Sequence, residues 1–386
     1  MERIYFDNAA TTAVAPQVLE AMLPCFSTVY GNASSLHTFG LEAKRALAQA
    51  RSSLAISLGV KEHEIVITSG GTEANNLALK GIAALHEHPQ HLIVSAIEHP
   101  SVLKTARALQ QAGWQMSSLR VEPDGRVAPD TLRAALRDNT ALVSIMTVNN
   151  ETGVVQPIAE LSAIAAEHGI PFHTDAVQAM GKIPLNLDNQ NIGLLTLAAH
   201  KFHGPKGVGL LVVRNRHKLI SQVTGGGQEE KRRAGTENLP GIVGMAKAAE
   251  LATAEGQKNR AHLKALSDHF LDFVESHLEG ACLNGERAHL APGIVNLSFP
   301  GMDSMALMMG LDLKGFAVSN GSACSSGSVS PSHVLQAMRI PKVRQLSALR
   351  ISFGKWNTPE QVEALQVALL ELTKGKMKVA KLAKQT

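Results

Sequence analysis

The chain has 386 residues, of which 45% are hydrophobic and 18% charged, a composition typical of a globular protein with two or three domains. Its formal charge of +4 is too small to indicate a nucleic-acid-binding protein, and three widely spaced cysteines exclude a disulfide framework and a CxxC metal site. The sequence shows no basic and apolar leader and no apolar run of about 18 residues, so we expect a cytoplasmic protein that enters no membrane.

Short apolar runs alternate with helical patterns between about residues 60 and 215. The predicted strands are segments 64–68, 91–96, 141–148, 170–176, 193–199 and 207–213. Strands that are apolar throughout are buried on both faces, as in a mostly parallel sheet covered by helices. This region therefore predicts an α/β domain that binds its ligand at the carboxyl ends of the strands.

The last third of the chain has the pattern of a smaller α+β domain. A long polar helix near 255–278 is followed by short apolar segments and by a last helix from Pro359. We expect residues 15–250 to form the large domain, and residues 1–14 and 251–386 to form the small one. The lysine-rich end of the chain is either a solvated tail or a docking segment for an acidic partner.

A glycine-containing turn follows the first predicted strand. In TSGGTEANN (68–76), Gly70 and Gly71 allow close approach of the backbone, and the turn opens directly into a helix. The N–H groups of a helix N-terminus, together with the hydroxyl of Thr72, suit a phosphate group. The spacing matches neither GxGxxG nor GxxxxGK[ST], which argues against dinucleotide-binding and Walker-type sites.

Polar residues also follow the next strands of the predicted sheet. Asp175 ends one apolar strand, and Lys201 comes just after another. A buried carboxylate requires a cation such as the protonated ring nitrogen of pyridoxal phosphate (PLP), and a desolvated lysine forms Schiff bases. His99 can stack on the flat ring, and Asn150 and Gln178 can hydrogen-bond the ring oxygen. Together these residues predict a PLP site.

Seven motifs occur in an order and spacing that resemble the cysteine desulfurases, PLP enzymes of the class V aminotransferase family. They are TSGGTEANN, EHPSV, VNNETGVVQPI, HTDAVQ, HKFHGPKGVG, RRAGTENLP and SNGSAC. The resemblance covers nearly the whole chain. It implies the PLP fold-type I architecture, in which helices flank a mostly parallel, seven-stranded-type sheet and a smaller α+β domain is attached.

The resemblance also implies individual roles. Lys201 carries the cofactor, and Arg350 grips the substrate carboxylate with the help of Asn150. Thr236 reaches the phosphate of the partner subunit, which implies a homodimer. The full set implied to bind the cofactor is Gly71, Thr72, His99, Asn150, Asp175, Gln178, His200, Lys201 and Thr236.

Cys324 lies in SNGSACSSGS (319–328), where small residues leave no apolar surface to bury the thiol. By resemblance, Lys201, His99 and Cys324 are the catalytic residues that convert L-cysteine to L-alanine. The sulfur stays on Cys324 as a persulfide until a sulfur acceptor takes it. The long cysteine segment is typical of the subgroup that serves iron–sulfur assembly, in which this cysteine can transiently ligate a cluster on a scaffold protein. Cys25 and Cys282 are interpreted as structural.

Two positions depart from the family pattern, and several alternatives stay open. Ala198 stands where relatives have a phosphate-binding serine, which predicts weaker cofactor retention, and Ala33 replaces a frequent proline. A selenocysteine lyase and another class V aminotransferase are the nearest alternatives. A metalloenzyme built on His86, His88 and His91, and an inactive scaffold, are further ones. We expect those three histidines to be solvated, because they surround a proline-containing turn.

Overall fold

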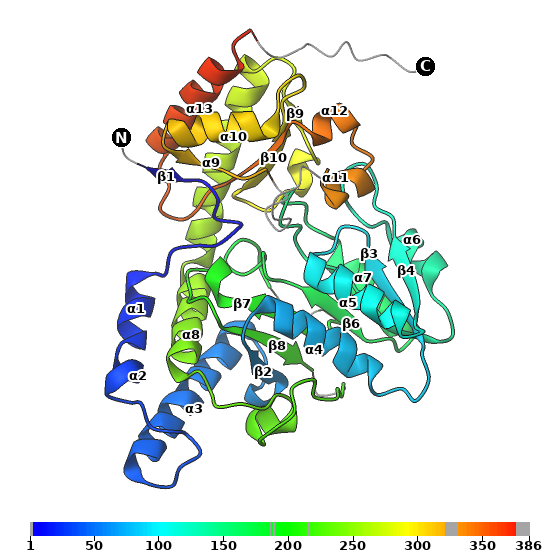
Figure 1. Ribbon diagram of the computed structural model, residues 1–386, viewed down its shortest axis with the longest axis vertical. Helices are drawn as coiled ribbons and strands as arrows, with labels where there is room; N and C mark the ends of the chain where they lie inside the picture. The colour runs from blue at the N-terminus through cyan, green and yellow to red at the C-terminus, as the bar shows by residue number, and fades with distance from the viewer. Residues whose placement is uncertain (1–2, 186, 188–189, 215–216, 321–330, 376–386) are drawn as a thin grey trace.

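The computed structural model describes residues 3–185, 187, 190–214, 217–320 and 331–375 (Figure 1). Its strands are β1 (Ile4–Tyr5), β2 (Ile65–Thr68), β3 (His91–Ser95), β4 (Gln115–Leu119), β5 (Thr140–Ser144), β6 (Phe172–Asp175), β7 (Leu194–Ala198), β8 (Gly209–Val213), β9 (Cys282–Leu283), β10 (Ile294–Ser298), β11 (Phe316–Ala317) and β12 (Ala348–Ser352). Its helices are α1 (Pro16–Met22), α2 (Pro24–Ser27), α3 (Thr38–Leu58), α4 (Gly71–Ala83), α5 (Pro100–Gln111), α6 (Pro129–Ala135), α7 (Ile158–Glu167), α8 (Leu239–Ala254), α9 (Gly256–His277), α10 (Ser304–Leu313), α11 (His333–Ala337), α12 (Lys342–Gln345) and α13 (Pro359–Thr373). Short 3-10 turns are η1 (Glu62–Glu64), η2 (Ala199–Lys201), η3 (Gln228–Lys231) and η4 (Arg287–His289).

The larger sheet has seven strands in the order β2-β8-β7-β6-β5-β3-β4. Neighbouring strands are parallel except at β8, which runs antiparallel to both β2 and β7. The predicted fold class, a mostly parallel seven-stranded sheet flanked by helices, is therefore confirmed.

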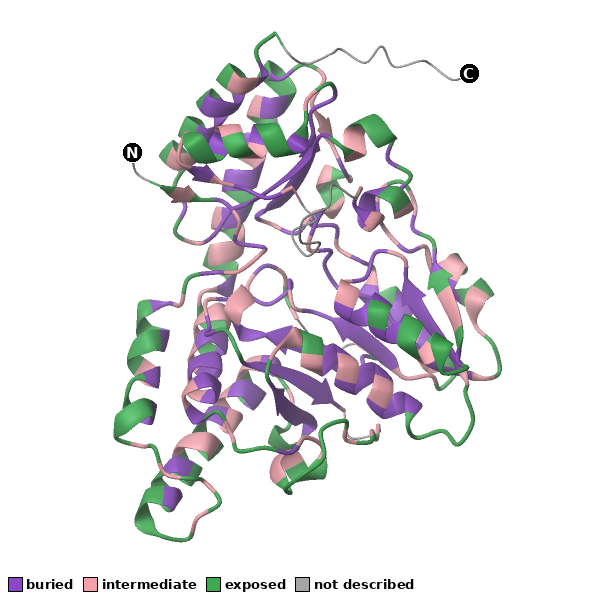
Figure 2. Ribbon diagram, in the orientation of Figure 1, coloured by how far each residue is buried: buried purple, intermediate pink, exposed green. Residues whose placement is uncertain are grey.

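The central strands of this sheet are buried on both faces, which explains why most of their residues are apolar, although β6 (FHTD) buries polar side chains (Figure 2). Side chains alternate between the faces along a strand. In β2, Ile65 and Ile67 share a core with residues of α3, α7 and α8, whereas Val66 shares one with residues of α4 and α5. The helices thus form a layer on each side of the sheet.

A second, antiparallel sheet of three strands, β12-β10-β9, lies with α9, α10 and α13 in the upper part of Figure 1. Its separate core includes the fully buried rings of Phe6, Phe270 and Phe353. The N-terminal strand β1 pairs with β11 in this part of the molecule. The assignment of residues 1–14 to the small domain requires such a pairing. The domain boundaries themselves stay a prediction.

The parallel strands end sooner than the apolar runs suggested, and the remaining residues form loops beyond the sheet. The run predicted as a strand over 141–148, for example, is a strand only as far as Ser144. Such loops follow β2, β3, β5, β6 and β7 at one edge of the sheet, and they carry the polar residues that the sequence singled out.

Candidate active site

A cavity of about 450 Å³ opens at the carboxyl ends of the parallel strands. Nine of the residues predicted to form the site line it, namely Gly71, Thr72, His99, Asn150, Asp175, Gln178, His200, Lys201 and Arg350. Thr236 lies on an exposed loop and is not among the lining residues, and Cys324 lies outside the described residues. One chain therefore brings together every described residue of the predicted site except Thr236.

Asp175 ends β6 with a buried carboxylate whose partners are all neutral. Its Oδ2 accepts a hydrogen bond of 2.7 Å from Nδ2 of Asn75, and its Oδ1 accepts one of 3.0 Å from the backbone N–H of Val177. In the described part of the chain, no cationic side chain forms an ion pair with it. A buried carboxylate without a cation is costly, so the site suits a ligand that brings a positive charge.

A hydrogen-bond chain links Asp175 to His99. Nδ2 of Asn75 also donates to Oγ of Ser101 at 2.8 Å, and Oγ of Ser101 lies 2.7 Å from Nδ1 of His99. Because Oγ accepts from the amide, its proton points to Nδ1, which leaves the other ring nitrogen protonated. Burial lowers the pKa of His99, an effect that Asp175 opposes and Lys201 and His333 reinforce, so the ring is neutral near pH 7.

Asn75 itself was not predicted, although it lies in the quoted TSGGTEANN motif. Its Oδ1 is buried and has no hydrogen-bond partner. A buried acceptor without a donor costs about 1–3 kcal/mol, and a group bound in the cavity can supply the missing donor. This oxygen lacks a hydrogen-bond donor, as the carboxylate of Asp175 lacks a cation. Both observations support the presence of a ligand in the cavity.

Lys201 ends η2, directly after β7. Its Nζ donates to the backbone oxygens of Ala9 and Ala10 at 2.6 and 2.7 Å. The N-terminal segment that carries these carbonyls is held in turn by Ser352, whose Oγ accepts from the N–H of Ala9. The amino group is therefore oriented at the cavity wall by backbone that belongs to a distant part of the chain.

The start of α4 forms the end of the cavity suited to an anion. Gly70 has φ 155° and caps the helix without a side-chain hydrogen bond, which leaves N–H groups of the first turn to a ligand. A Cβ on Gly71 would lie 3.0 Å from Cγ2 of Val177 and 3.6 Å from Cβ of Ala198. The sequence departure at Ala198 therefore lies beside this anion site, where a serine hydroxyl is absent.

His200 lies on the same wall, next to Lys201. Its Nδ1 is 3.1 Å from Oγ1 of Thr11. Burial, together with the charges of Lys201 and Lys206, lowers the pKa of His200 to about 4. The ring is consequently neutral at physiological pH and can offer an N–H to an anion without a net charge.

Arg350 projects from β12, in the smaller sheet, to the mouth of the cavity. Its Nη2 donates to Oδ1 of Asp7 at 2.5 Å and its Nη1 to the backbone oxygen of Asn150 at 2.9 Å. The Nε of Arg350 is buried without a hydrogen-bond partner. The guanidinium therefore retains donor capacity, although Asp7, which sequence reasoning did not identify, already neutralises part of its charge.

The described ends of the segment that contains Cys324 meet residues of this site. Ser319 and Arg350 exchange backbone hydrogen bonds of 3.1 and 2.6 Å. On the other side, Oγ of Ser332 donates to Oε2 of Glu151 at 2.5 Å, and Nε2 of His333 lies 3.0 Å from the backbone oxygen of Glu98. The residues that precede and follow this segment are therefore hydrogen-bonded to residues beside the cavity.

Two further buried ionisable groups near the cavity were missed from the sequence. Glu98, which precedes His99, is fully buried, and burial raises its pKa to about 8. Lys182 is 6% exposed, and burial lowers its pKa to about 7. The sequence signal that could have identified each of these groups is a charged residue within an otherwise apolar stretch.

The histidines proposed for a metal site do not form one in the described residues. His86 and His88 are exposed as expected, but the expectation for His91 was wrong. His91 begins β3 and is buried, with its ring nitrogens 2.9 Å from Oγ1 of Thr140 and Oγ of Ser117. The position is explained by the sheet, because the first residue of β3 faces the protein interior rather than the preceding turn.

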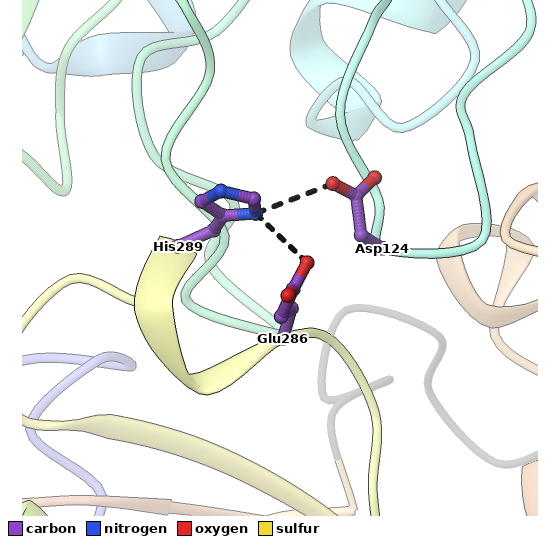
Figure 3. Close-up of side chains that lie close together, drawn as sticks. All are labelled: Asp124, Glu286 and His289. Atoms are coloured by element: carbon purple, nitrogen blue, oxygen red, sulfur yellow. Dashed lines mark ion pairs between the residues drawn. The ribbon is translucent and has the colours of Figure 1, made fainter.

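A different cluster, Asp124, Glu286 and His289, has the ligand atoms of a metal site (Figure 3). Nδ1 of His289 lies 3.3 Å from a carboxylate oxygen of each acid, while Nη1 of Arg126 lies 3.2 Å from Nε2. A guanidinium can only donate, so Nε2 is the acceptor and Nδ1 carries the proton that faces the two carboxylates. These contacts join the turn before α6 to η4, although neither contact of Nδ1 has the geometry of a hydrogen bond.

Comparisons with known proteins agree with this geometry. The family model for class V aminotransferases matches residues 4–365. The cysteine desulfurase IscS of Dictyoglomus turgidum is 46% identical over 360 residues, which are 93% of this chain and 91% of that protein. A solved NifS-like protein superposes with a TM-score of 0.90 at 35% identity and covers 96% of this chain and 99% of its own. The structure of SspA in complex with cysteine gives a TM-score of 0.81 at 36% identity, with coverage of 92% and 99%.

Proposed function

The chain belongs to the class V aminotransferase family, and we propose that it is a PLP-dependent cysteine desulfurase. In this reaction L-cysteine gives up its sulfur and leaves as L-alanine. The observation that carries the proposal is the single cavity lined by Lys201, Asp175, His99 and Arg350. Relatives named as cysteine desulfurases, at about the same length as this chain, support the choice of substrate.

The residues of the cavity fit PLP. Among the described residues, Asp175 is a buried carboxylate with only neutral partners, so the protonated ring nitrogen of PLP would supply its missing cation. The phosphate suits the N-terminus of α4, with Gly71 and Thr72 there and the neutral His200 nearby. When bound, PLP supplies an electron sink that stabilises negative charge at the α-carbon of an amino acid.

The side chains of this protein do the remaining work. Lys201 holds the cofactor and takes the proton from the substrate α-carbon, since its amino group is the base at the cavity wall. His99, held neutral and oriented by Ser101, covers the ring, and Gln178 and Asn150 contact its polar edge. Arg350 binds the substrate carboxylate through donors that Asp7 and Asn150 leave available.

Cys324 receives the sulfur. Its thiolate attacks the substrate sulfur to form an S–S bond, the Cβ–S bond breaks, and its electron pair and a proton end on Cβ of the departing alanine. The attachment of Ser319 to Arg350 and of Ser332 to Glu151 supports this role, because both attachments lie beside the cavity. A sulfur acceptor or an iron–sulfur scaffold protein then takes the sulfur, and Cys324 can transiently ligate a cluster on such a scaffold.

A homodimer completes the site in this proposal. Thr236 is exposed and does not line the cavity of its own chain, which suits a phosphate ligand for a second copy. Exposed apolar side chains on α1, α2, the start of α3 and the segments that connect them support such an interface, because large apolar residues there lack cover. They are Leu19, Leu23, Phe26, Tyr30, Leu36 and Phe39.

We place the protein in the cytoplasm. No helix in the described part of the chain is long and apolar enough to cross a membrane. The two cysteines of that part are free thiols, which suits a reducing compartment.

The test is alanine formation from L-cysteine by PLP-loaded protein in the presence of a reductant. We expect wild-type protein and a Cys282→Ala variant to release alanine, whereas Lys201→Ala and Cys324→Ala release little. Cys282 is a matched control, since its thiol lies in the smaller sheet away from the cavity. Release of alanine from L-selenocysteine but not from L-cysteine would contradict the proposal and favour a selenocysteine lyase.

A further inference from the structure

A second lysine is buried close behind Lys201. Lys182 lies in the turn after β6 and is only 6% exposed. Within the described residues, its hydrogen bond runs from Nζ to Oε1 of Gln178 at 3.3 Å, and no carboxylate there forms an ion pair with it. Buried lysines usually have an acidic partner, so this ammonium group is not explained by packing alone.

Hydrogen bonds connect the two lysines. The amide of Gln178 accepts from Lys182 and donates from Nε2 to the backbone oxygen of Ala9 at 2.7 Å. That same oxygen accepts from Nζ of Lys201 at 2.6 Å. A change at Lys182 therefore reaches Lys201 through one side chain and one carbonyl.

The two lysines also share a second cavity of about 40 Å³, which is distinct from the substrate cavity. A buried water needs roughly 10–15 Å³ of such space, so the cavity has room for a few water molecules. Thr12, His203 and Lys355 line it as well.

The charges around Lys182 are predominantly positive. Burial and the charge of Lys201 lower the pKa of Lys182 to about 7, and burial lowers that of His203 to about 4. Lys355 is the remaining cation, and its ion pair of 3.2 Å with Glu255 offsets its charge. Repulsion between the two ammonium groups is mutual, so the lysines lose their first proton as a pair, and Lys201 is unprotonated in those molecules in which Lys182 keeps its proton.

We propose that Lys182 is a positioning residue that keeps Lys201 unprotonated and oriented for bonding to the aldehyde of PLP. This inference rests on the proposed function, since it assigns Lys182 a task only if Lys201 carries PLP. The repulsion between the ammonium groups acts on protonation, and the Gln178–Ala9 connection acts on orientation. An amine next to another cation is a better nucleophile near neutral pH because more of it is unprotonated.

The test measures how fast apoprotein takes up PLP, followed by absorbance across a range of pH. For Lys182→Arg, whose guanidinium stays charged where Lys182 loses its proton, we expect the rate to rise to half its maximum at a pH equal to or below that of wild-type protein. For Lys182→Met we expect this midpoint about one pH unit higher, as for the loss of a neighbouring like charge, with a similar rate at high pH. Lys355→Met combined with Glu255→Gln is the matched control, with an unchanged midpoint, because the two changes remove an ion pair as a whole and leave the net charge unaltered.

The outcomes separate this inference from the proposed function. A wild-type protein that binds no PLP would overturn both. Normal uptake by wild-type protein with an unshifted midpoint in Lys182→Met would overturn the role of Lys182 alone, as would a rate reduced equally at every pH. If Lys182→Met does not fold, by near-ultraviolet circular dichroism, Lys182→Gln takes its place with the same expected midpoint.

Discussion

Glu98 gives a sharp test of the electrostatics beneath the site. Its Oε1 accepts hydrogen bonds from Oγ of Ser95 and from the N–H of Met146, whereas its buried Oε2 has no partner. Burial raises its pKa to about 8, the negative charge of Asp175 adds to this, and the hydrogen bonds from Ser95 and Met146 oppose it. Glu98 is therefore protonated in the native protein at neutral pH.

The sign of the pH effect follows from proton counting. Between the pKa of about 4.5 of an exposed glutamate and about 8, the unfolded chain has lost this proton and the native protein has kept it. The free energy of unfolding therefore falls as the pH rises through this window. At about 1.4 kcal/mol for each pH unit, the loss is at most about 5 kcal/mol.

Glu98→Gln removes this dependence because an amide does not ionise. The variant keeps the Oε1 acceptor but places an NH₂ group where Oε2 has no partner, at a cost of about 1–2 kcal/mol. We expect it to be less stable than wild-type protein at pH 5 and more stable at pH 9, as measured by urea denaturation midpoints. Glu87→Gln, at an exposed carboxylate, should show no such crossing. Parallel curves for Glu98→Gln and wild-type protein would refute the reasoning.

Three further predictions follow from individual contacts. Ala198→Ser places a hydroxyl beside the anion end of the cavity, which adds one hydrogen bond to a charged group. PLP should therefore bind roughly tenfold more tightly, as measured by equilibrium dialysis, whereas Ala198→Val should not increase its affinity. Asp175→Asn removes the carboxylate that we propose pairs with the ring nitrogen of PLP. We expect a folded protein that loses PLP on dialysis, and retention as strong as in wild-type protein would contradict this role. Lys231 has φ 65° and an exposed side chain, so Lys231→Gly should raise the free energy of unfolding by about 0.5–1 kcal/mol in urea, whereas Lys231→Ala should leave it nearly unchanged.

The central fold was readable from the sequence because its strands are buried on both faces. The runs that became β2, β3, β5, β7 and β8 are largely apolar without alternation, and this is the pattern of a covered sheet, whereas β6 (FHTD) is mostly polar. The edge strand β4 (Gln115–Leu119, QMSSL) went unnoticed, because one polar, partly exposed strand at the end of a sheet lacks that pattern. The long helix α3 was missed for a related reason, since alanine and polar residues obscure its apolar face.

The candidate site was predictable where each residue follows a strand, and less so where distant segments meet. Asp175 and Lys201 end neighbouring strands, so their convergence follows from a parallel sheet. The ion pair of Arg350 with Asp7 depends on how the N-terminal segment crosses the cavity. So does the position of the Ala9 backbone oxygen, which accepts hydrogen bonds from both Lys201 and Gln178. No local pattern in the sequence encodes such a crossing. The role of Cys324 stays a prediction, because it lies outside the described residues.

The most direct measurement is the mass of the peptide that contains Cys324 after PLP-loaded protein reacts with L-cysteine without a reductant. We expect this peptide to gain the mass of one sulfur atom, in an amount equal to the alanine released, and to lose it on reduction. The peptides of Cys25 and Cys282 should remain unchanged. Alanine release with an unmodified Cys324 peptide would contradict the account, since the sulfur would then leave the substrate by another route.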